Sequence, residues 1–315
     1  MAICSRLVDN VRMQGHTDEI EAIDYTKVDW DRVRHSEYLV HQRFCYEYPA
    51  PIHDLRHQLM VVPPTTFGDQ LRTIYSLEVS KPGKVITRMD AFSNTVIDVR
   101  IPLVEGAIEF ESWVTLERTG PARPRVLPAS WLHDPRLLTP TERTRPDAAI
   151  EEVALTLSRS GLQGLALAEL ANTWVYETMV YTPGATSVHT TAADAISTRR
   201  GVCQDYSHLM LALCRRLGLP TLYVSGHLLG EGGTHAWVEV VLPATDDLDV
   251  ANGWALDPTH GCRANLSYLT VAVGRDYGDV APTSGSYRAG HGGELQASKE
   301  VHLIGLTYEP TIGTS

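Results

Sequence analysis

The pattern of apolar positions changes along the chain, from strand-like alternation to a helical spacing. Over residues 38–48, Tyr, Val and Phe side chains share one face, and His41, Arg43 and Glu47 share the other. Residues 107–117 repeat this alternation, which is typical of a strand with one buried face. Shorter strand candidates lie between them, separated by Pro-Pro, Pro-Gly and Ser-Asn turns, at residues 55–62, 73–79, 85–88 and 95–101. The pattern predicts an antiparallel β-sandwich.

After residue 146 the apolar residues recur at i, i+3, i+4 and i+7, which predicts amphipathic helices. One follows Asp147 and ends at Gly161, and a second covers residues 167–175. A third runs from Cys203 to residue 217, where Gly218 and Pro220 act as stop signals. Strands rich in Val, Tyr and Trp follow at residues 221–229, 235–242 and 254–257. The fold class expected for the whole chain is α+β.

A proline-rich stretch separates the two patterns. Six of the eighteen prolines lie between residues 118 and 146, a density that excludes a long helix or a central strand. Six arginines lie there too, as expected of a solvated linker. We therefore expect an N-terminal extension (1–34), a β-sandwich domain (35–118), a Pro/Arg-rich linker (119–146), an α+β domain (147–305) and a C-terminal tail (306–315).

Composition narrows the class of protein. With 315 residues, 43% of them apolar and 21% charged, the chain is long enough for two packed domains. A net charge of −11 disfavours binding to nucleic acid or to an anionic membrane, since phosphate neutralisation needs clustered Lys and Arg. The N-terminus lacks the apolar core of a secretory signal, and the five scattered cysteines do not suit a disulfide framework. We expect a cytoplasmic protein.

Cys203 opens the third predicted helix, directly after Gly201 and Val202. The positive end of the helix dipole stabilises a thiolate, which is the reactive form of a cysteine. Free N–H groups at the same helix end could also stabilise the oxyanion that forms when the thiolate attacks a carbonyl. Taken alone, a cysteine is more often a small buried residue, so the interpretation depends on its neighbours.

His235 begins one later strand, and Asp257 ends the next. On adjacent antiparallel strands, the carboxylate could accept a hydrogen bond from the imidazole while the imidazole acts as base towards Cys203. Nucleophile, base and orienting carboxylate would then come together. Trp237, Gln204 and Tyr206 are candidate accessory residues, although core packing explains Trp237 at least as well. Asp205 could be only a favourable charge at the helix N-terminus, and His208 could be a core histidine.

Four segments together resemble the bacterial transglutaminase-like superfamily: GVCQDYSHLMLALCRRLGLPTLYVSGHL (201–228), THAWVEVVLP (234–243), GWALDPTHG (253–261) and VAVGRDYGDVAP (271–282). The upstream strand at residues 38–48 and the turn at residues 90–94 are similar to the N-terminal domain that accompanies many members. The resemblance spans residues 35 to 305.

The resemblance implies a papain-like core, a triad of Cys203, His235 and Asp257, and acyl-enzyme chemistry on an amide or related acyl group. Two residues depart from the family pattern: Ser93 stands where the turn usually has glycine, and His260 where asparagine is usual. We expect neither to touch the triad. The oxyanion side chain is left open among Trp174, Tyr181 and residues 186–191.

Three hypotheses remain. A thiol enzyme would transfer the acyl group from a peptide, protein or small amide to water or to an amine, and hydrolysis is favoured because no D-x-D-x-D-G calcium loop is present. An amide synthase would take the acyl group from a carrier-protein thioester, with Arg199, Arg200, Arg215 and Arg216 as a candidate basic patch. A non-catalytic interaction module would be expected to lack a triad residue.

No cofactor or metal is expected. Zinc at Cys203, His208, His235 and Cys262 finds no support in the spacing of these residues. Cys214 lies about 16 Å along the helix from Cys203, too far for a disulfide, and is expected in the core. A homo-oligomer is left open.

Overall fold

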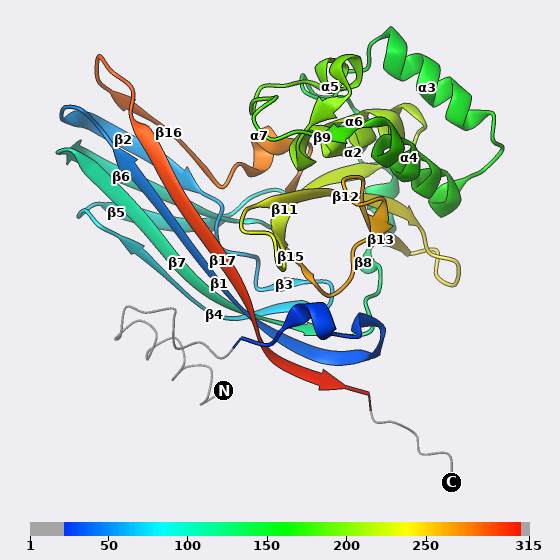
Figure 1. Ribbon diagram of the computed structural model, residues 1–315, viewed down its shortest axis with the longest axis horizontal. Coiled ribbons are helices and arrows are strands. Elements are labelled where there is room, and N and C mark those ends of the chain that lie inside the picture. Colours follow the sequence, from blue (N-terminus) through cyan, green and yellow to red (C-terminus); the bar gives the residue numbers. More distant parts are fainter. Residues whose placement is uncertain (1–21, 310–315) are drawn as a thin grey trace.

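The computed structural model describes residues 22–309, which form a β-sandwich beside an α+β domain (Figure 1). One sheet of the sandwich has the strand order β17-β1-β7-β4-β3, and the other has the order β16-β2-β6-β5. Two short 3-10 helices, η2 (Tyr25–Lys27) and η3 (Trp30–Arg32), precede the first strand. The strands are β1 (Val33–Glu47), β2 (Ile52–Leu59), β3 (Thr66–Phe67), β4 (Gln70–Val79), β5 (Lys84–Met89), β6 (Thr95–Val104), β7 (Ala107–Thr119), β16 (Thr283–Arg288) and β17 (Glu294–Tyr308).

The alternation along β1 and β7 builds the sandwich core, as predicted. The two strands pair antiparallel, with Phe44 opposite Phe110. Both rings pack against Leu55 and Ile97 of the facing sheet, and all four side chains are buried. Burying one face of each sheet against the other removes a continuous apolar surface from water, which is the main stabilising contribution to this domain.

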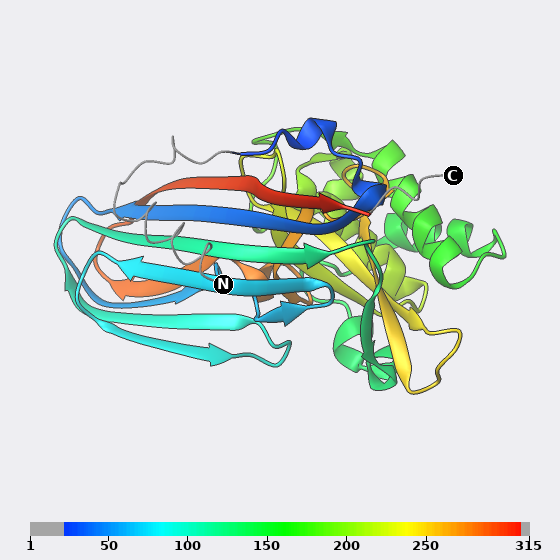
Figure 2. The same cartoon turned by 90° about the horizontal axis from the view of Figure 1, so that it is seen from below.

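The last two strands also belong to the sandwich. Strand β17 pairs antiparallel along the whole of β1, and β16 pairs with β2. Figures 1 and 2 show the red C-terminal strand beside the blue first strand. The boundaries expected at residues 305 and 306 are therefore corrected: the chain returns to its first domain after residue 282. Strand β17 lies at a sheet edge with mostly exposed side chains, so its sequence carries little apolar alternation.

The α+β domain packs its helices on a six-stranded sheet of order β14-β13-β12-β11-β15, with β8 added beside β13. Its strands are β8 (Arg125–Pro128), β11 (Thr221–Leu228), β12 (His235–Pro243), β13 (Val250–Asp257), β14 (Cys262–Arg263) and β15 (Tyr268–Gly274). Strands β9 (Val180–Tyr181) and β10 (Arg200–Gly201) form a separate parallel pair. The helices are α2 (Pro135–Leu138), α3 (Ala148–Ser158), α4 (Gly164–Thr178), α5 (Ala192–Thr198), α6 (Cys203–Arg216) and α7 (Tyr277–Val280), with the 3-10 helix η4 (Ala129–His133).

Helix α6 is the centre of this domain. It packs on β11 and β12 and is surrounded by α3, α4 and α5, so nearly all of its side chains are buried (Figure 1). The three helices predicted from sequence are confirmed, including the Asp147 side chain that caps α3. Within residues 22–309, no helix is long and apolar enough to cross a membrane.

The proline-rich segment is not a solvated linker. Its strand β8 pairs antiparallel with β13 and extends the sheet of the α+β domain. The Arg125 guanidinium forms an ion pair with the Glu239 carboxylate of β12, and the Glu239 side chain is only 3% exposed. Phe67 and Trp131 lie against the same guanidinium. Proline is tolerated in an edge strand such as β8. The position of Arg125 depends on Glu239, which is distant in the sequence, so the local sequence does not predict it.

Replacing Arg125 by methionine is expected to lower the free energy of unfolding by about 3–5 kcal/mol, because Glu239 would become a buried charge without a partner. Urea unfolding followed by circular dichroism measures this loss. The double variant Arg125→Met/Glu239→Gln should recover much of it, since the uncompensated charge is then removed. Equal losses in the single and double variants would contradict this account of the ion pair.

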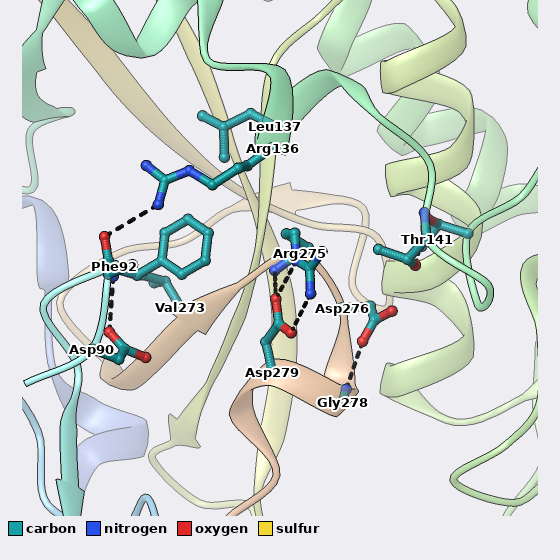
Figure 3. A network of polar contacts seen from close by, with 12 residues as sticks. Asp90, Phe92, Arg136, Leu137, Thr141, Val273, Arg275, Asp276, Gly278 and Asp279 are labelled. Atoms are coloured by element: carbon teal, nitrogen blue, oxygen red, sulfur yellow. Dashed lines mark hydrogen bonds and ion pairs between the residues drawn. The ribbon is translucent and has the colours of Figure 1, made fainter.

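The turn at residues 90–94 fixes the sandwich against the second domain. The Asn94 side chain is buried, donates to the Val273 carbonyl at 2.7 Å and accepts from the Val273 amide at 2.8 Å. The Phe92 ring lies 4.7 Å from the Arg136 guanidinium, next to Val273 (Figure 3). Ser93 has a φ of 66°, a left-handed conformation that glycine adopts most easily, which accounts for the glycine expected at this position.

Candidate active site

The three predicted triad residues lie at the ends of adjacent elements. Cys203 is the first residue of α6, His235 is the first of β12, and Asp257 is the last of β13. Strands β12 and β13 pair antiparallel, so the start of one lies near the end of the other. The fold therefore brings together residues that are far apart in the sequence.

A direct hydrogen bond connects His235 and Asp257, and the Cys203 thiol lies near the imidazole. His235 Nε2 lies 2.8 Å from Asp257 Oδ2, and both side chains are almost completely buried. The Cys203 thiol lies near this imidazole, close enough to help raise its pKa. Cys203 itself is half-buried, whereas the other two side chains are almost completely buried. A thiol, an imidazole and a carboxylate in this order are what a nucleophile, a base and an orienting group would require.

The surroundings of His235 favour its protonated form. Burial lowers the pKa of His235, but the hydrogen bonds with Asp257, Cys203 and Glu231 outweigh burial and raise it above its ordinary value. Burial raises the pKa of Asp257, and the hydrogen bonds with His235 and His260 reverse this and hold it below its usual range. A charged imidazolium between a carboxylate and a thiol is the arrangement that stabilises a thiolate.

Asp257 is held by several donors besides His235. One oxygen accepts from the backbone amides of Thr259 and His260, at 2.7 and 3.3 Å. The other accepts from the Tyr268 hydroxyl at 2.8 Å and lies 2.7 Å from His260 Nδ1. The carboxylate is thus fixed in position, and with it the orientation of the His235 imidazole.

Two contacts at the triad were not predicted. His260 contacts Asp257 directly, so the expectation that this departure from the family pattern leaves the triad untouched is wrong. Glu231, in the loop before β12, places Oε2 3.0 Å from His235 Nδ1 and Oε1 3.3 Å from His260 Nε2. The signals were a histidine three residues after the triad aspartate and an acidic residue in a glycine-rich loop before the triad histidine, but neither specifies a contact by itself.

The candidate accessory residues differ in their surroundings. The Trp237 ring is buried, with its centroid 6.0 Å from that of His235 and 5.3 Å from that of Tyr268. Gln204 instead donates to the Ser187 carbonyl at 3.2 Å, and Tyr206 lies in the hydrophobic core. Trp237 therefore borders the triad imidazole, whereas Gln204 and Tyr206 support the surrounding structure.

Neighbouring polar residues also support the structure around α6. Asp205 accepts from the Val202 amide at 2.8 Å and from the Thr186 hydroxyl at 2.6 Å. A Cβ atom on Gly201 would lie 2.5 Å from the Asp205 carboxylate, so glycine is required for this close approach. His208 is buried, accepts from the Tyr277 amide at 3.2 Å, and burial lowers its pKa to about 4.

The strand pair β9–β10 places Tyr181 next to Gly201, two residues before the nucleophile. Tyr181 is half-exposed. Its pKa is raised by burial and by the nearby charges of Cys203 and Glu231. Of the side chains considered for an oxyanion site, Tyr181 is near enough to Cys203 for its charge to act on the phenol, whereas Trp174 packs against the core and Thr186 is bound to Asp205.

The basic patch considered for a carrier protein is not intact. Arg215 is buried, where it donates to the Leu137 carbonyl at 3.2 Å and to the Thr144 hydroxyl at 2.7 Å. Arg216 pairs with Glu151. Arg199 and Arg200 remain exposed. Cys214 lies in the core, as expected, where burial raises its pKa to about 12.

Comparison with known families agrees with this geometry. The family model described as the transglutaminase-like superfamily matches residues 152–258, which include all three triad residues. A second model, the bacterial transglutaminase-like N-terminal region, matches residues 38–117 of the sandwich.

Relatives match much of the chain. The uncharacterized protein ML0607 of Mycobacterium leprae is 31% identical over 223 residues, which cover 66% of this chain and 77% of that protein. The uncharacterized protein Rv2569c of Mycobacterium tuberculosis is 32% identical over 222 residues, 66% of each chain. A crystal structure from Cytophaga hutchinsonii, described as that of a candidate cysteine protease, is 19% identical with a TM-score of 0.71 and covers 89% of this chain and 94% of that one. This last similarity establishes the shared fold.

Proposed function

Because the chain belongs to the transglutaminase-like superfamily, we propose that it is a cysteine-dependent enzyme that forms a thioester at Cys203 from an amide or peptide-like substrate. It then transfers the acyl group to water or to an amine. The observation that carries the proposal is the buried hydrogen bond between His235 and Asp257, next to the half-buried Cys203 thiol.

In the first step, the Cys203 thiolate attacks the substrate carbonyl carbon and a carbon–sulfur bond forms. The carbonyl oxygen becomes an oxyanion, which the unpaired N–H groups of the first turn of α6 can stabilise. We assign the Tyr181 hydroxyl as a further donor, because β9 places it beside the segment that leads to Cys203. The imidazolium of His235 gives its proton to the leaving amine, and the carbon–nitrogen bond breaks.

In the second step, neutral His235 takes a proton from water or from an acceptor amine, which attacks the thioester. The carbon–sulfur bond breaks, and Cys203 leaves as the thiolate beside a protonated His235. Water gives a peptidase or amidase, and an amine gives a transferase. We favour hydrolysis, because Cys203 is only half-buried and its surroundings do not enclose the thioester from solvent.

The biosynthetic alternative keeps the same residues and takes the acyl group from a carrier-protein thioester. Of the four arginines considered for carrier binding, Arg199 and Arg200 are the exposed ones. A non-catalytic interaction module is disfavoured, because nothing in such a function calls for a half-buried thiol beside a buried imidazole–carboxylate pair.

The test is to trap the acyl-enzyme. The protein is incubated with p-nitrophenyl acetate and with short peptide amides, quenched in acid, digested and examined by peptide mass spectrometry. We expect an acyl group on Cys203 that hydroxylamine removes and that Cys203→Ala abolishes, whereas Cys45→Ala retains it. Products formed with and without an added amine then distinguish transfer from hydrolysis. Acylation of Cys262 in place of Cys203 would contradict the proposal.

A cytoplasmic location remains part of the proposal. It is supported by Cys45, Cys203, Cys214 and Cys262, all of which are free thiols.

A further inference from the structure

Glu231 occupies the side of the catalytic imidazole that faces away from Asp257. Its carboxylate lies 3.0 Å from His235 Nδ1 and 3.3 Å from His260 Nε2. His260 in turn lies 2.7 Å from Asp257, which lies 2.8 Å from His235. Two imidazoles and two carboxylates therefore alternate in a closed ring, a cluster that we call the His–carboxylate ring (Glu231, His235, Asp257 and His260).

The ring has an inner and an outer half. The side chains of His235 and Asp257 are 1% and 0% exposed, whereas those of Glu231 and His260 are 40% and 42% exposed. Glu231 and His260, which we call the outer pair, therefore lie on the solvent side of His235 and Asp257. The Glu231 carboxylate contacts Nδ1 of His235, the ring nitrogen that does not contact Asp257.

Local backbone structure fixes the outer pair. Gly230 has a φ of 92°, and a Cβ atom there would lie 2.2 Å from the Tyr25 hydroxyl oxygen, so the loop closes against the segment that precedes β1. The Glu231 amide donates to the Leu228 carbonyl at 3.0 Å. His260 is held by its own amide, which donates to Asp257. These contacts position the backbone of both residues, and the side chains are held by their ion pairs within the ring.

The outer pair places two opposite charges beside the catalytic ion pair. Hydrogen bonds with His235 and His260 lower the pKa of Glu231 to about 2, so it is an anion above that pH. Hydrogen bonds with Asp257 and Glu231 raise the pKa of His260 to about 9, so it is a cation at neutral pH. A negative charge near a titrating pair makes each proton harder to remove, and a positive charge makes each proton easier to remove.

The other titratable groups around the pair come from several elements. They are Cys203 of α6, Tyr181 of β9, Cys262 of β14, Tyr268 of β15 and Lys299 of β17, whose ammonium donates to the Thr234 hydroxyl at 2.7 Å. Substitutions at Glu231 or His260 do not remove these groups, so their effect on the Cys203–His235 pair is the same in all variants.

We propose that Glu231 and His260 are positioning residues that set, in opposite directions, the lower pH limit at which the Cys203–His235 ion pair forms. The proposal rests on the thiol-enzyme function proposed above. Glu231 moves this limit to higher pH, because its negative charge beside His235 disfavours a second negative charge at Cys203. His260 moves it to lower pH, because its charge offsets that of Glu231.

The test is the pH dependence of iodoacetamide alkylation at Cys203, read by peptide mass spectrometry from pH 3 to pH 9. Relative to wild type, Glu231→Gln should shift the low-pH midpoint down by about one unit, and His260→Asn should shift it up by a similar amount. Glu151→Gln is the matched control, since Glu151 is a 41% exposed carboxylate paired with Arg216 at the far end of α6. Its midpoint should equal that of wild type.

Midpoints that shift in the same direction in both variants, or in neither, would overturn the inference. A general loosening of the structure would shift both midpoints the same way, because its effect does not depend on the sign of the removed charge. Thermal melts of the three variants establish that each is folded. A wild-type Cys203 that titrates as an ordinary thiol would overturn the proposed function as well. A low-pH midpoint that is present but insensitive to both variants would overturn the inference alone.

Discussion

Replacing His235 by alanine is expected to lower kcat/KM for acyl transfer on the order of 10⁴-fold. The thiol of Cys203 would lose the imidazolium that holds it as a thiolate, and the leaving amine would lose its proton donor. Both steps of the proposed reaction use this one ring. The rate of acyl-enzyme formation, measured by quenched mass spectrometry, gives the loss directly.

The control for this variant is His53→Ala, which removes an exposed histidine from β2 of the sandwich. Its rate should equal that of wild type. Asp257 keeps the Tyr268 hydroxyl and His260 as partners in His235→Ala, so the variant should remain folded. A rate within tenfold of wild type in a folded His235→Ala protein would contradict the role of His235 as base.

Replacing Asp257 by asparagine is expected to reduce kcat/KM on the order of 10³- to 10⁴-fold. Asparagine presents an N–H group as well as an oxygen, so it can favour the wrong tautomer of His235 and does not stabilise an imidazolium. Asp257→Ala should in addition lower the free energy of unfolding by about 3–5 kcal/mol. That variant leaves His235, His260 and Tyr268 as buried or half-buried donors without their acceptor.

Kinetics and urea unfolding separate these two effects. The matched control is Asp98→Asn, which removes a partly exposed carboxylate paired with Arg88 on the surface of the sandwich. It should change stability by less than about 1 kcal/mol and leave kcat/KM unchanged. An Asp257→Asn enzyme with wild-type activity would show that the carboxylate holds the fold but does not orient the imidazole.

The sequence predicts the elements of the site better than it predicts their surroundings. Cys203, His235 and Asp257 each lie at the end of a strongly patterned helix or strand, so their approach follows from local periodicity and antiparallel pairing. The contacts of Glu231 and His260 depend on the geometry of a glycine-rich loop and a turn. Neither segment has a periodic pattern of apolar residues, so the sequence does not predict these contacts.

The domain boundaries show the same limit. The predicted sandwich strands are present, but β16 and β17 join them from the far end of the chain. Long-range pairing of an edge strand has no local signature, because its exposed side chains need not alternate. Arg125 likewise occupies a proline-rich segment typical of a linker, and its role depends on Glu239, more than a hundred residues away in the sequence.

The central claim is that Cys203 is held as a thiolate by His235, and the alkylation rate of Cys203 against pH tests it most directly. Cys262 serves as an internal reference. The residue as a whole is exposed, but partial burial of its sulfur raises the pKa of the thiol. We predict that Cys203 reacts with iodoacetamide at nearly constant rate from pH 6 to pH 8, whereas Cys262 slows about tenfold per unit of decreasing pH. The result that would contradict the account is a Cys203 rate that falls in parallel with that of Cys262 and does not change in His235→Ala.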